Sequence, residues 1–192
     1  MTIHSSPANS IGRDIGTESE LVDQFLDGLI DDQTREGIWK ADQEILEQGP
    51  VAQGRSDSAI GLALGYVQSG KTTTITALAA AAADDGYRVI VALLGSTNLL
   101  LDQNQDRIET ALSIGVRQDY RWKIEVNPKG KKGAKSIAEW LERDRTLFLP
   151  VLKHAGRIRD LAAVLEELSM TDVPTLIIDD EADQAARALW AR

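Results

Sequence analysis

Eight consecutive residues have the types and spacing of a phosphate-binding loop. Gly65 to Thr72 read Gly-Tyr-Val-Gln-Ser-Gly-Lys-Thr and fit the pattern G-x-x-x-x-G-K-[ST]. In such a loop, backbone N–H groups and a helix N-terminus present hydrogen-bond donors and partial positive charge to the phosphates. Lys71 adds a point charge for the β- and γ-phosphates, and Thr72 adds a hydroxyl for Mg²⁺. The predicted nucleotide-binding residues are Gly65, Gln68, Ser69, Gly70, Lys71, Thr72 and Thr73.

The segments on either side of this loop are those that would position it. Residues 59–64 form an apolar run of the length of a buried strand, and residues 72–83 form an alanine-rich segment without glycine or proline. The predicted order is therefore strand, glycine-bearing turn and helix. The alternative is a glycine-containing surface turn beside a lysine.

A phosphate loop needs a carboxylate partner, because Mg²⁺ takes hard oxygen ligands. Asp179 to Asp183 read Asp-Asp-Glu-Ala-Asp and directly follow the apolar run 175–178. At this position Asp180 is the expected Mg²⁺ ligand, with Asp179 as the alternative register. Glu181 is the expected catalytic base, which orients the attacking water. The alternative interpretation is that these acidic residues only complement the dipole of a helix that follows them.

Composition excludes several classes of protein. The 192 residues are 43% hydrophobic, contain no cysteine and carry a formal charge of −9. The sequence therefore has no disulfide framework or thiolate metal site, and as a whole it lacks the electrostatics of an autonomous nucleic-acid binder. His4 and His154 form no metal-ligand pattern. No leader or long apolar run is present, which predicts a cytoplasmic protein without a membrane partner.

The chain begins with residues that precede the first predicted strand. Residues 1–16 are polar and without period, which predicts a disordered lead-in. A capping box at 17–20 opens an expected helix over 17–30, and a second helix is expected over 34–48 with Ile38, Ala41 and Ile45 inward. We expect residues 17–58 to form a helical appendage and linker, and residues 59–192 to form the nucleotide-binding lobe.

After residue 59, predicted strands and helices alternate. Strands are expected over 87–94, 120–126, 146–152 and 175–178, and helices over 97–114, 134–143 and 158–168. Continuous apolar strands separated by helices imply a mainly parallel sheet with helices on both faces. The predicted fold class is therefore α/β.

Four lysines gather in the stretch 127–135, which glycine and proline punctuate. Lys129, Lys131 and Lys132 are candidate contacts to a nucleic-acid backbone, and an ordinary solvated loop is the alternative.

Four segments taken in order resemble the Z-one domain family. They are residues 65–72, 85–90, 94–107 and 177–184, and Asp180 to Asp183 spell the DEAD motif of superfamily-two helicases. The resemblance covers about residues 59–184. It implies the first RecA-like lobe of an endonuclease-associated, helicase-like ATP hydrolase found in restriction and DNA-defence gene neighbourhoods, with ATP and Mg²⁺ as cofactors and DNA as partner.

The resemblance also places Ser96 and Thr97 at a motif that touches a nucleic-acid strand in helicases. Both can donate hydrogen bonds to phosphate oxygens. A simple N-cap role for Thr97 is equally compatible with the sequence.

The chain ends at Arg192, soon after Glu181, and thus departs from the family. By the resemblance, the second RecA-like lobe and its arginine finger are missing, or a partner subunit supplies them. We therefore expect nucleotide binding with deficient hydrolysis. The alternatives are a stand-alone P-loop phosphotransferase, for which Arg157 and Arg159 are the only late arginine pair near the site, and a non-catalytic interaction fragment.

Overall fold

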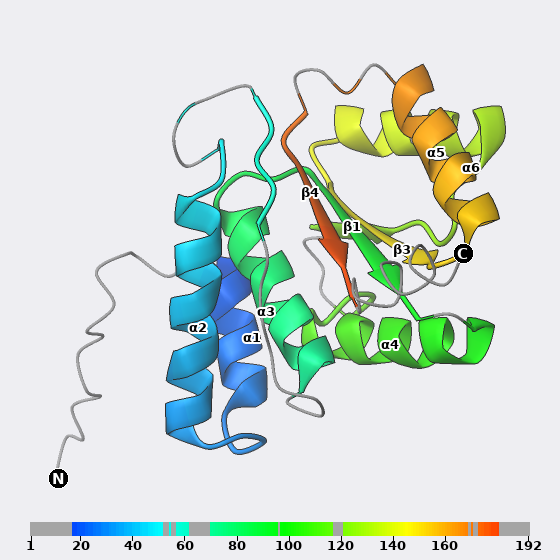
Figure 1. The fold of residues 1–192 in the computed structure, drawn as a ribbon. Coiled ribbons are helices and arrows are strands. Elements are labelled where there is room, and N and C mark those ends of the chain that lie inside the picture. The colour runs from blue at the N-terminus through cyan, green and yellow to red at the C-terminus, as the bar shows by residue number, and fades with distance from the viewer. Residues whose placement is uncertain are drawn as a thin grey trace, which may run out of the picture.

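The structure is a computed structural model and describes residues 17–51, 54, 57–61, 70–95, 97–116, 121–168, 170 and 173–180. Within these residues it contains six helices and four strands (Figure 1). The predicted lead-in at 1–16 lies outside the described residues.

The four strands form one parallel sheet in the order β2-β3-β1-β4. They are β1 (Val89–Leu94), β2 (Trp122–Ile124), β3 (Thr146–Leu152) and β4 (Thr175–Asp179). β1 lies between β3 and β4, and its residues from Val89 to Ala92 are fully buried. The prediction of an α/β fold with a parallel sheet is therefore confirmed.

Helices cover both faces of this sheet, as predicted. Ile90 and Ala92 of β1 and Phe148 of β3 pack in the same core as α3 (Lys71–Asp84) and α4 (Asn98–Ala111). The alternate residues, such as Val91, belong to the core beneath α5 (Gly130–Glu142) and α6 (Ala155–Glu167). Burying each large aliphatic side chain contributes roughly 1.5–3 kcal/mol, so two-sided burial explains the apolar strands.

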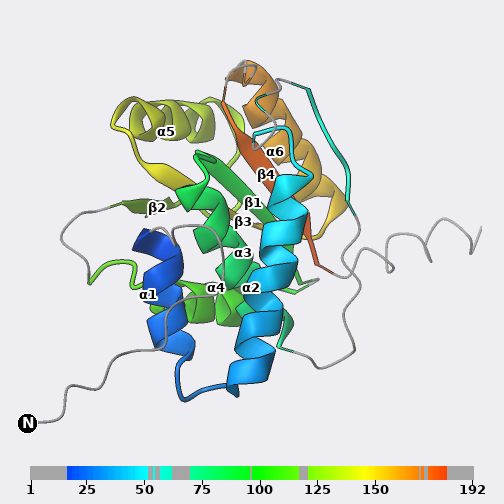
Figure 2. The same ribbon diagram turned by 90° about the vertical axis from the view of Figure 1, so that its left-hand side faces the viewer.

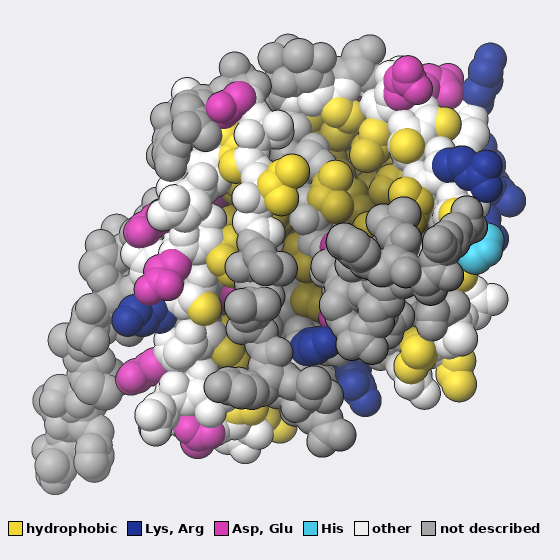
Figure 3. Space-filling model, in the orientation of Figure 1, with side chains coloured by type: hydrophobic (Ala, Val, Ile, Leu, Met, Phe, Trp, Pro, Cys, Tyr) yellow, Lys and Arg dark blue, Asp and Glu magenta, His cyan; other side chains and the backbone are white. Residues whose placement is uncertain are grey.

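The cover over β4 is incomplete among the described residues. Ile177 pairs with Val91 and so faces the α5–α6 side, yet it is 57% exposed. Figure 3 shows hydrophobic side chains in view between β4 and the α5–α6 pair.

Two N-terminal helices pack against α3. They are α1 (Thr17–Leu26) and α2 (Asp32–Glu47), and Figure 2 shows them on either side of α3. Asp84, the last residue of α3, accepts hydrogen bonds from the backbone N–H groups of Glu18 (3.1 Å) and Ser19 (2.8 Å) and from the Ser19 hydroxyl (2.7 Å). A carboxylate distant in sequence thus binds the first N–H groups of α1 and fixes this helix to the end of α3.

The buried stripe of α2 differs from the predicted one by one position. Ala41 is exposed, whereas Asp42 is completely buried and Leu46 is 2% exposed. Ile38 and Ile45 pack partly against the core as expected. The stripe follows i, i+4 spacing from Ile38 through Asp42 to Leu46, so the helix turns its acidic residue inward.

Other predicted boundaries also need correction. Residues 59–61 are exposed and outside the sheet, and Ile60 is fully exposed, so the predicted strand at 59–64 does not form over its described part. β2 is shorter than predicted, α1 ends at Leu26 and α4 at Ala111. α5 begins at Gly130 rather than at 134, and α6 begins at Ala155 rather than at 158.

No helix within the described residues is long and apolar enough to span a membrane.

The buried carboxyl of Asp42 makes the stability of the protein dependent on pH. Neither carboxyl oxygen has a hydrogen-bond partner, and burial raises the pKa of Asp42 from 3.8 to about 8. The destabilisation is absent below about pH 4, grows as the pH rises between the two pKa values and is complete above about pH 8.

We therefore expect Asp42→Asn to change the pH dependence of folding. Relative to the wild type, its free energy of unfolding should rise by a few kcal/mol, in order of magnitude, between pH 4 and pH 8. Denaturant titrations at both pH values measure this difference. Glu44→Gln, an exposed substitution on the same helix, is the control, and an equal pH response of the two variants would contradict the buried-carboxyl account.

Candidate nucleotide site

The structure brings the two predicted halves of the site together at the carboxyl edge of the sheet. Lys71 is the first residue of α3, and Asp180 follows β4. The Lys71 ammonium nitrogen lies 3.9 Å from a carboxylate oxygen of Asp180. The two side chains are 42% and 18% exposed respectively, so the pair is accessible from solvent on the lysine side. This arrangement fits a site at the carboxyl ends of parallel strands.

The start of α3 lies beside Asp180 and begins with a left-handed glycine. Gly70 is the N-cap residue, with φ 68° and ψ 36°, a left-handed conformation that favours glycine. The backbone N–H of Thr74 donates to the Gly70 carbonyl at 3.1 Å and so closes the first helical turn. The N–H groups of Lys71, Thr72 and Thr73 precede that bond and have no helical acceptor. They point toward the helix N-terminus, where an anion is favoured.

Asn104 contacts the candidate site, although the sequence predicted no role for it. The Thr72 hydroxyl donates to the Asn104 side-chain oxygen at 3.1 Å. A hydroxyl that uses its proton in this way keeps its oxygen lone pairs for a cation. Asn104 lies on α4, within the segment 94–107 that carries the family resemblance. Nothing in its spacing indicates this contact, because it depends on how α3 packs against α4.

Lys153 is a second site residue that the sequence reasoning missed. Its ammonium nitrogen lies 2.7 Å from a carboxylate oxygen of Asp179 and donates to the backbone carbonyl of Asp180 at 2.9 Å. The side chain is only 12% exposed. The available signal was a lysine immediately after the apolar run 146–152.

These contacts distinguish the two aspartates that the sequence left as alternatives. Asp179 is paired with Lys153, whereas Asp180 is the carboxylate near Lys71 at the start of α3. The geometry therefore favours Asp180 over Asp179 as the acidic partner of the phosphate loop.

Several predicted site residues lie outside the described residues. These are Gly65, Gln68, Ser69, Ser96 and Glu181. Thr73 is described and half-buried, and a Cβ on Gly70 would lie 3.7 Å from its hydroxyl.

Thr97 acts as the N-cap of α4. Its side-chain oxygen accepts a hydrogen bond from the backbone N–H of Leu100 at 3.3 Å. The interpretation of Thr97 as an N-cap residue is therefore confirmed. The residue remains exposed at the carboxyl end of β1, beside Leu99 and Leu100, which are 66% and 44% exposed.

The stretch 130–135 is helical, so the interpretation of these lysines as part of a loop was wrong, while their contact with nucleic acid stays a prediction. Lys129 is the N-cap residue of α5, and Lys131 and Lys132 lie in its first turn. All three are exposed. The chain turns at Asn127, just before α5. This residue adopts φ 47°, and its side-chain oxygen accepts a hydrogen bond from the backbone N–H of Leu152 at 2.9 Å.

Gly133 lies inside α5, where it allows close packing. Gly133 is buried, and a Cβ there would lie 3.3 Å from Pro128. The lysines thus occupy a helix N-terminus that follows the carboxyl end of β2, on the same edge of the sheet as Lys71.

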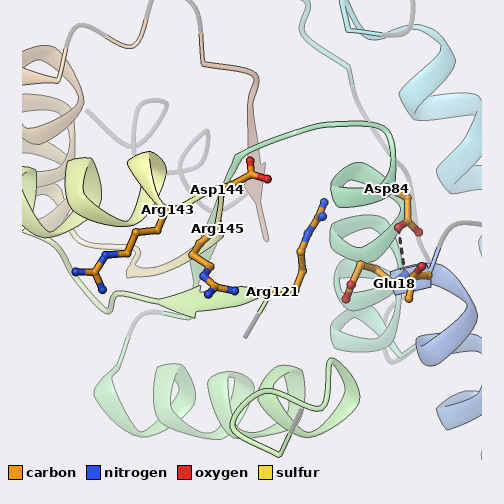
Figure 4. A pocket seen from close by; sticks show the side chains of 7 residues that line it. Glu18, Asp84, Arg121, Arg143, Asp144 and Arg145 are labelled. Atoms are coloured by element: carbon orange, nitrogen blue, oxygen red, sulfur yellow. Dashed lines mark hydrogen bonds between the residues drawn. The ribbon is translucent and has the colours of Figure 1, made fainter. Parts of the chain in front are cut away.

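A cavity of about 410 Å³ lies at the opposite edge, near the starts of β2 and β3 (Figure 4). It is lined by Thr17, Glu18, Asp84, Arg121, Arg143, Asp144 and Arg145. Its acidic groups serve the fold: Asp84 caps α1, Glu18 accepts from the Trp122 indole at 2.6 Å, and Asp144 pairs with Arg88 at 2.9 Å. The cavity is therefore separate from the Lys71–Asp180 site.

The donor set at the carboxyl edge fits Mg²⁺ bound together with phosphates. Within the described ranges, no group of three or more histidine, aspartate or glutamate side chains could hold a metal by itself. Mg²⁺ commonly takes one or two carboxylates and completes its shell with substrate phosphates and water. Thr72 and Asp180 offer the hydroxyl and the carboxylate for such a shared site.

Comparison of the chain with protein-family models, curated proteins and solved structures finds no match.

Proposed function

We propose that this protein binds ATP with Mg²⁺ at the carboxyl edge of its sheet, as the first RecA-like lobe of a superfamily-two-like, DNA-directed ATPase related to the Z-one domain family. The observation that carries the proposal is the approach of Lys71 to Asp180. These residues are 109 positions apart (180 − 71). The parallel fold nevertheless places them on one edge, as a phosphate loop and its acidic partner require.

The charges at this edge suit a Mg²⁺–triphosphate. The free N–H groups at the start of α3 and the Lys71 ammonium attract the phosphates, while Thr72 and Asp180 would hold the Mg²⁺. The metal would neutralise phosphate charge and draw the β- and γ-phosphates into one geometry. In the proposal, Glu181 orients the water that attacks the γ-phosphate.

The RecA-like assignment and the partner belong to the same proposal. Its support is the parallel sheet, the α3 helix that begins at the phosphate loop, and the acidic segment at the end of β4. The helical pair α1 and α2, fixed to α3, would be the appendage. DNA would contact Thr97 and the lysines of α5, and by the resemblance Ser96, since Lys129, Lys131 and Lys132 are exposed together on a chain of net charge −9.

The first test removes the Lys71 charge. Lys71→Ala should abolish Mg²⁺–ATP binding measured by isothermal titration calorimetry, because the phosphates lose the ammonium group at the start of α3. Lys40→Ala, an exposed lysine change on α2, is the matched control and should bind as the wild type does. Unchanged affinity in a folded Lys71→Ala protein would overturn the proposed site.

The second test concerns DNA. Neutralising Lys129, Lys131 and Lys132 to glutamine should weaken binding to a duplex oligonucleotide. It should also flatten the slope of log K against log salt by about 0.9 for each lysine that contacts a phosphate. Fluorescence anisotropy across a salt series measures both quantities, with Lys40→Gln as the control. A slope equal to that of the wild type would exclude this helix end as a DNA contact.

A further inference from the structure

We propose that Lys153 is a positioning residue that holds the end of β4 so that Asp180, and not Asp179, faces Lys71 at the start of α3. This inference rests on the proposed function, because it assigns the acidic ligand of that same site. It adds to the site a residue that directly follows β3, the strand on the far side of β1 from β4.

Alternation along the strands puts the two aspartates on opposite faces of the sheet. Asp179 pairs with Leu93, which packs in the core under α5 and α6. The next residue, Asp180, therefore points toward the α3–α4 face, where Lys71 begins α3. A shift of one residue in β4 would exchange the two carboxylates.

Lys153 lies on the same face as Asp179. Leu152 pairs with Leu94 and packs on the α3–α4 side, so the following residue turns to the other face. Its backbone N–H donates to the Gly95 carbonyl at 3.0 Å, which fixes it to the end of β1. Its side chain then reaches past β1 to Asp179 and to the Asp180 carbonyl, at 2.7 and 2.9 Å.

One residue thus ties together the carboxyl ends of three strands. The backbone of Asp180 is also held from β1, since its N–H donates to the Leu93 carbonyl at 3.2 Å. The charge of Lys153 offsets that of Asp179 on the α5–α6 face, while Lys71 lies beside Asp180 on the other face. Because Lys153 is 12% exposed, water screens this pairing only partly.

Loss of Lys153 should therefore weaken the contribution of Mg²⁺ to nucleotide binding. Without it, the Asp179 carboxylate loses the ammonium group 2.7 Å away, and the Asp180 carbonyl loses the hydrogen bond that holds it. Changes in the groups that orient a metal ligand typically cost about 10- to 100-fold in metal affinity. Binding of the nucleotide without metal depends on Lys71 and the start of α3, and should change little.

The experiment compares the Kd for a non-hydrolysable ATP analogue in Mg²⁺ and in EDTA, by calorimetry. The Kd in EDTA divided by the Kd in Mg²⁺ gives the factor by which Mg²⁺ strengthens nucleotide binding, and this factor is the ratio used below. In Lys153→Met this ratio should fall about 10- to 100-fold while the Kd in EDTA stays at the wild-type value. Lys153→Arg should restore most of the ratio, and Lys40→Met, the same change on an exposed surface, should leave it intact.

A double variant tests whether Lys153 acts through Asp180. Asp180→Asn should lower the ratio by itself, and adding Lys153→Met should lower it no further. Additive losses would show that Lys153 acts elsewhere and would overturn the proposal.

Other outcomes separate this inference from the proposed function. An unchanged ratio in Lys153→Met, or equal losses in Mg²⁺ and in EDTA, would overturn the positioning role while the nucleotide site stands. A wild-type protein that binds no nucleotide under either condition would overturn the proposed function itself. If Lys153→Met does not fold, Lys153→Gln, which keeps a donor but not the charge, should lower the ratio, and an unchanged ratio there overturns the role.

Discussion

The parallel pairing of β1 with both β3 and β4 is the constraint on which the rest of the structure depends. It aligns the carboxyl ends of three strands. The residues proposed to bind nucleotide lie either directly after one of these strands or at the start of α3. Pairing of this kind needs crossover connections, and these become the helices that cover the sheet. The central position of β1, with Val89 to Ala92 fully buried, makes the arrangement costly to alter.

Helix α3 connects this edge with the N-terminal helices. Its first residue, Lys71, faces Asp180, and its last residue, Asp84, receives the N-terminus of α1. The Asp84 carboxylate thus lies at the N-terminus of α1, the end of that helix where an anion is favoured, and an anion is likewise expected at the start of α3. The buried Asp42 of α2 works against this docking, because its carboxyl has no hydrogen-bond partner and lies in the interior.

The sequence was sufficient to predict features governed by local pattern. Apolar runs indicated the four strands of the sheet, and strand–helix alternation indicated that the sheet is parallel. A strand that is buried on both faces consists almost entirely of apolar residues, so it can be recognised from the sequence. Features set by contacts distant in the chain were not predictable in this way. The Asp84 cap, the Thr72–Asn104 hydrogen bond and the Lys153–Asp179 pair each join residues from different elements.

The errors have equally physical causes. Gly130 and Gly133 suggested a loop, yet Gly133 lies within α5 where Pro128 packs closely against it. In α2 the pattern favoured Ala41 over Asp42 as the inward residue, since burial of an unpaired carboxyl is normally avoided. The sequence pattern ranked Asp180 over Asp179 without excluding the alternative, because one residue of register decides the face, and in the structure Asp180 is the carboxylate beside Lys71.

The central claim is that metal and nucleotide bind together at the Lys71–Asp180 edge. Paramagnetic Mn²⁺, used in place of Mg²⁺ with ATP and monitored by amide NMR spectra, tests it most directly, since Mn²⁺ broadens the signals of nearby nuclei. The account predicts nucleotide-dependent broadening at Thr72, Thr73 and Asp180, with Arg121 and Asp144 at the opposite edge unaffected. Broadening centred on the opposite edge, or none that depends on nucleotide, would contradict it.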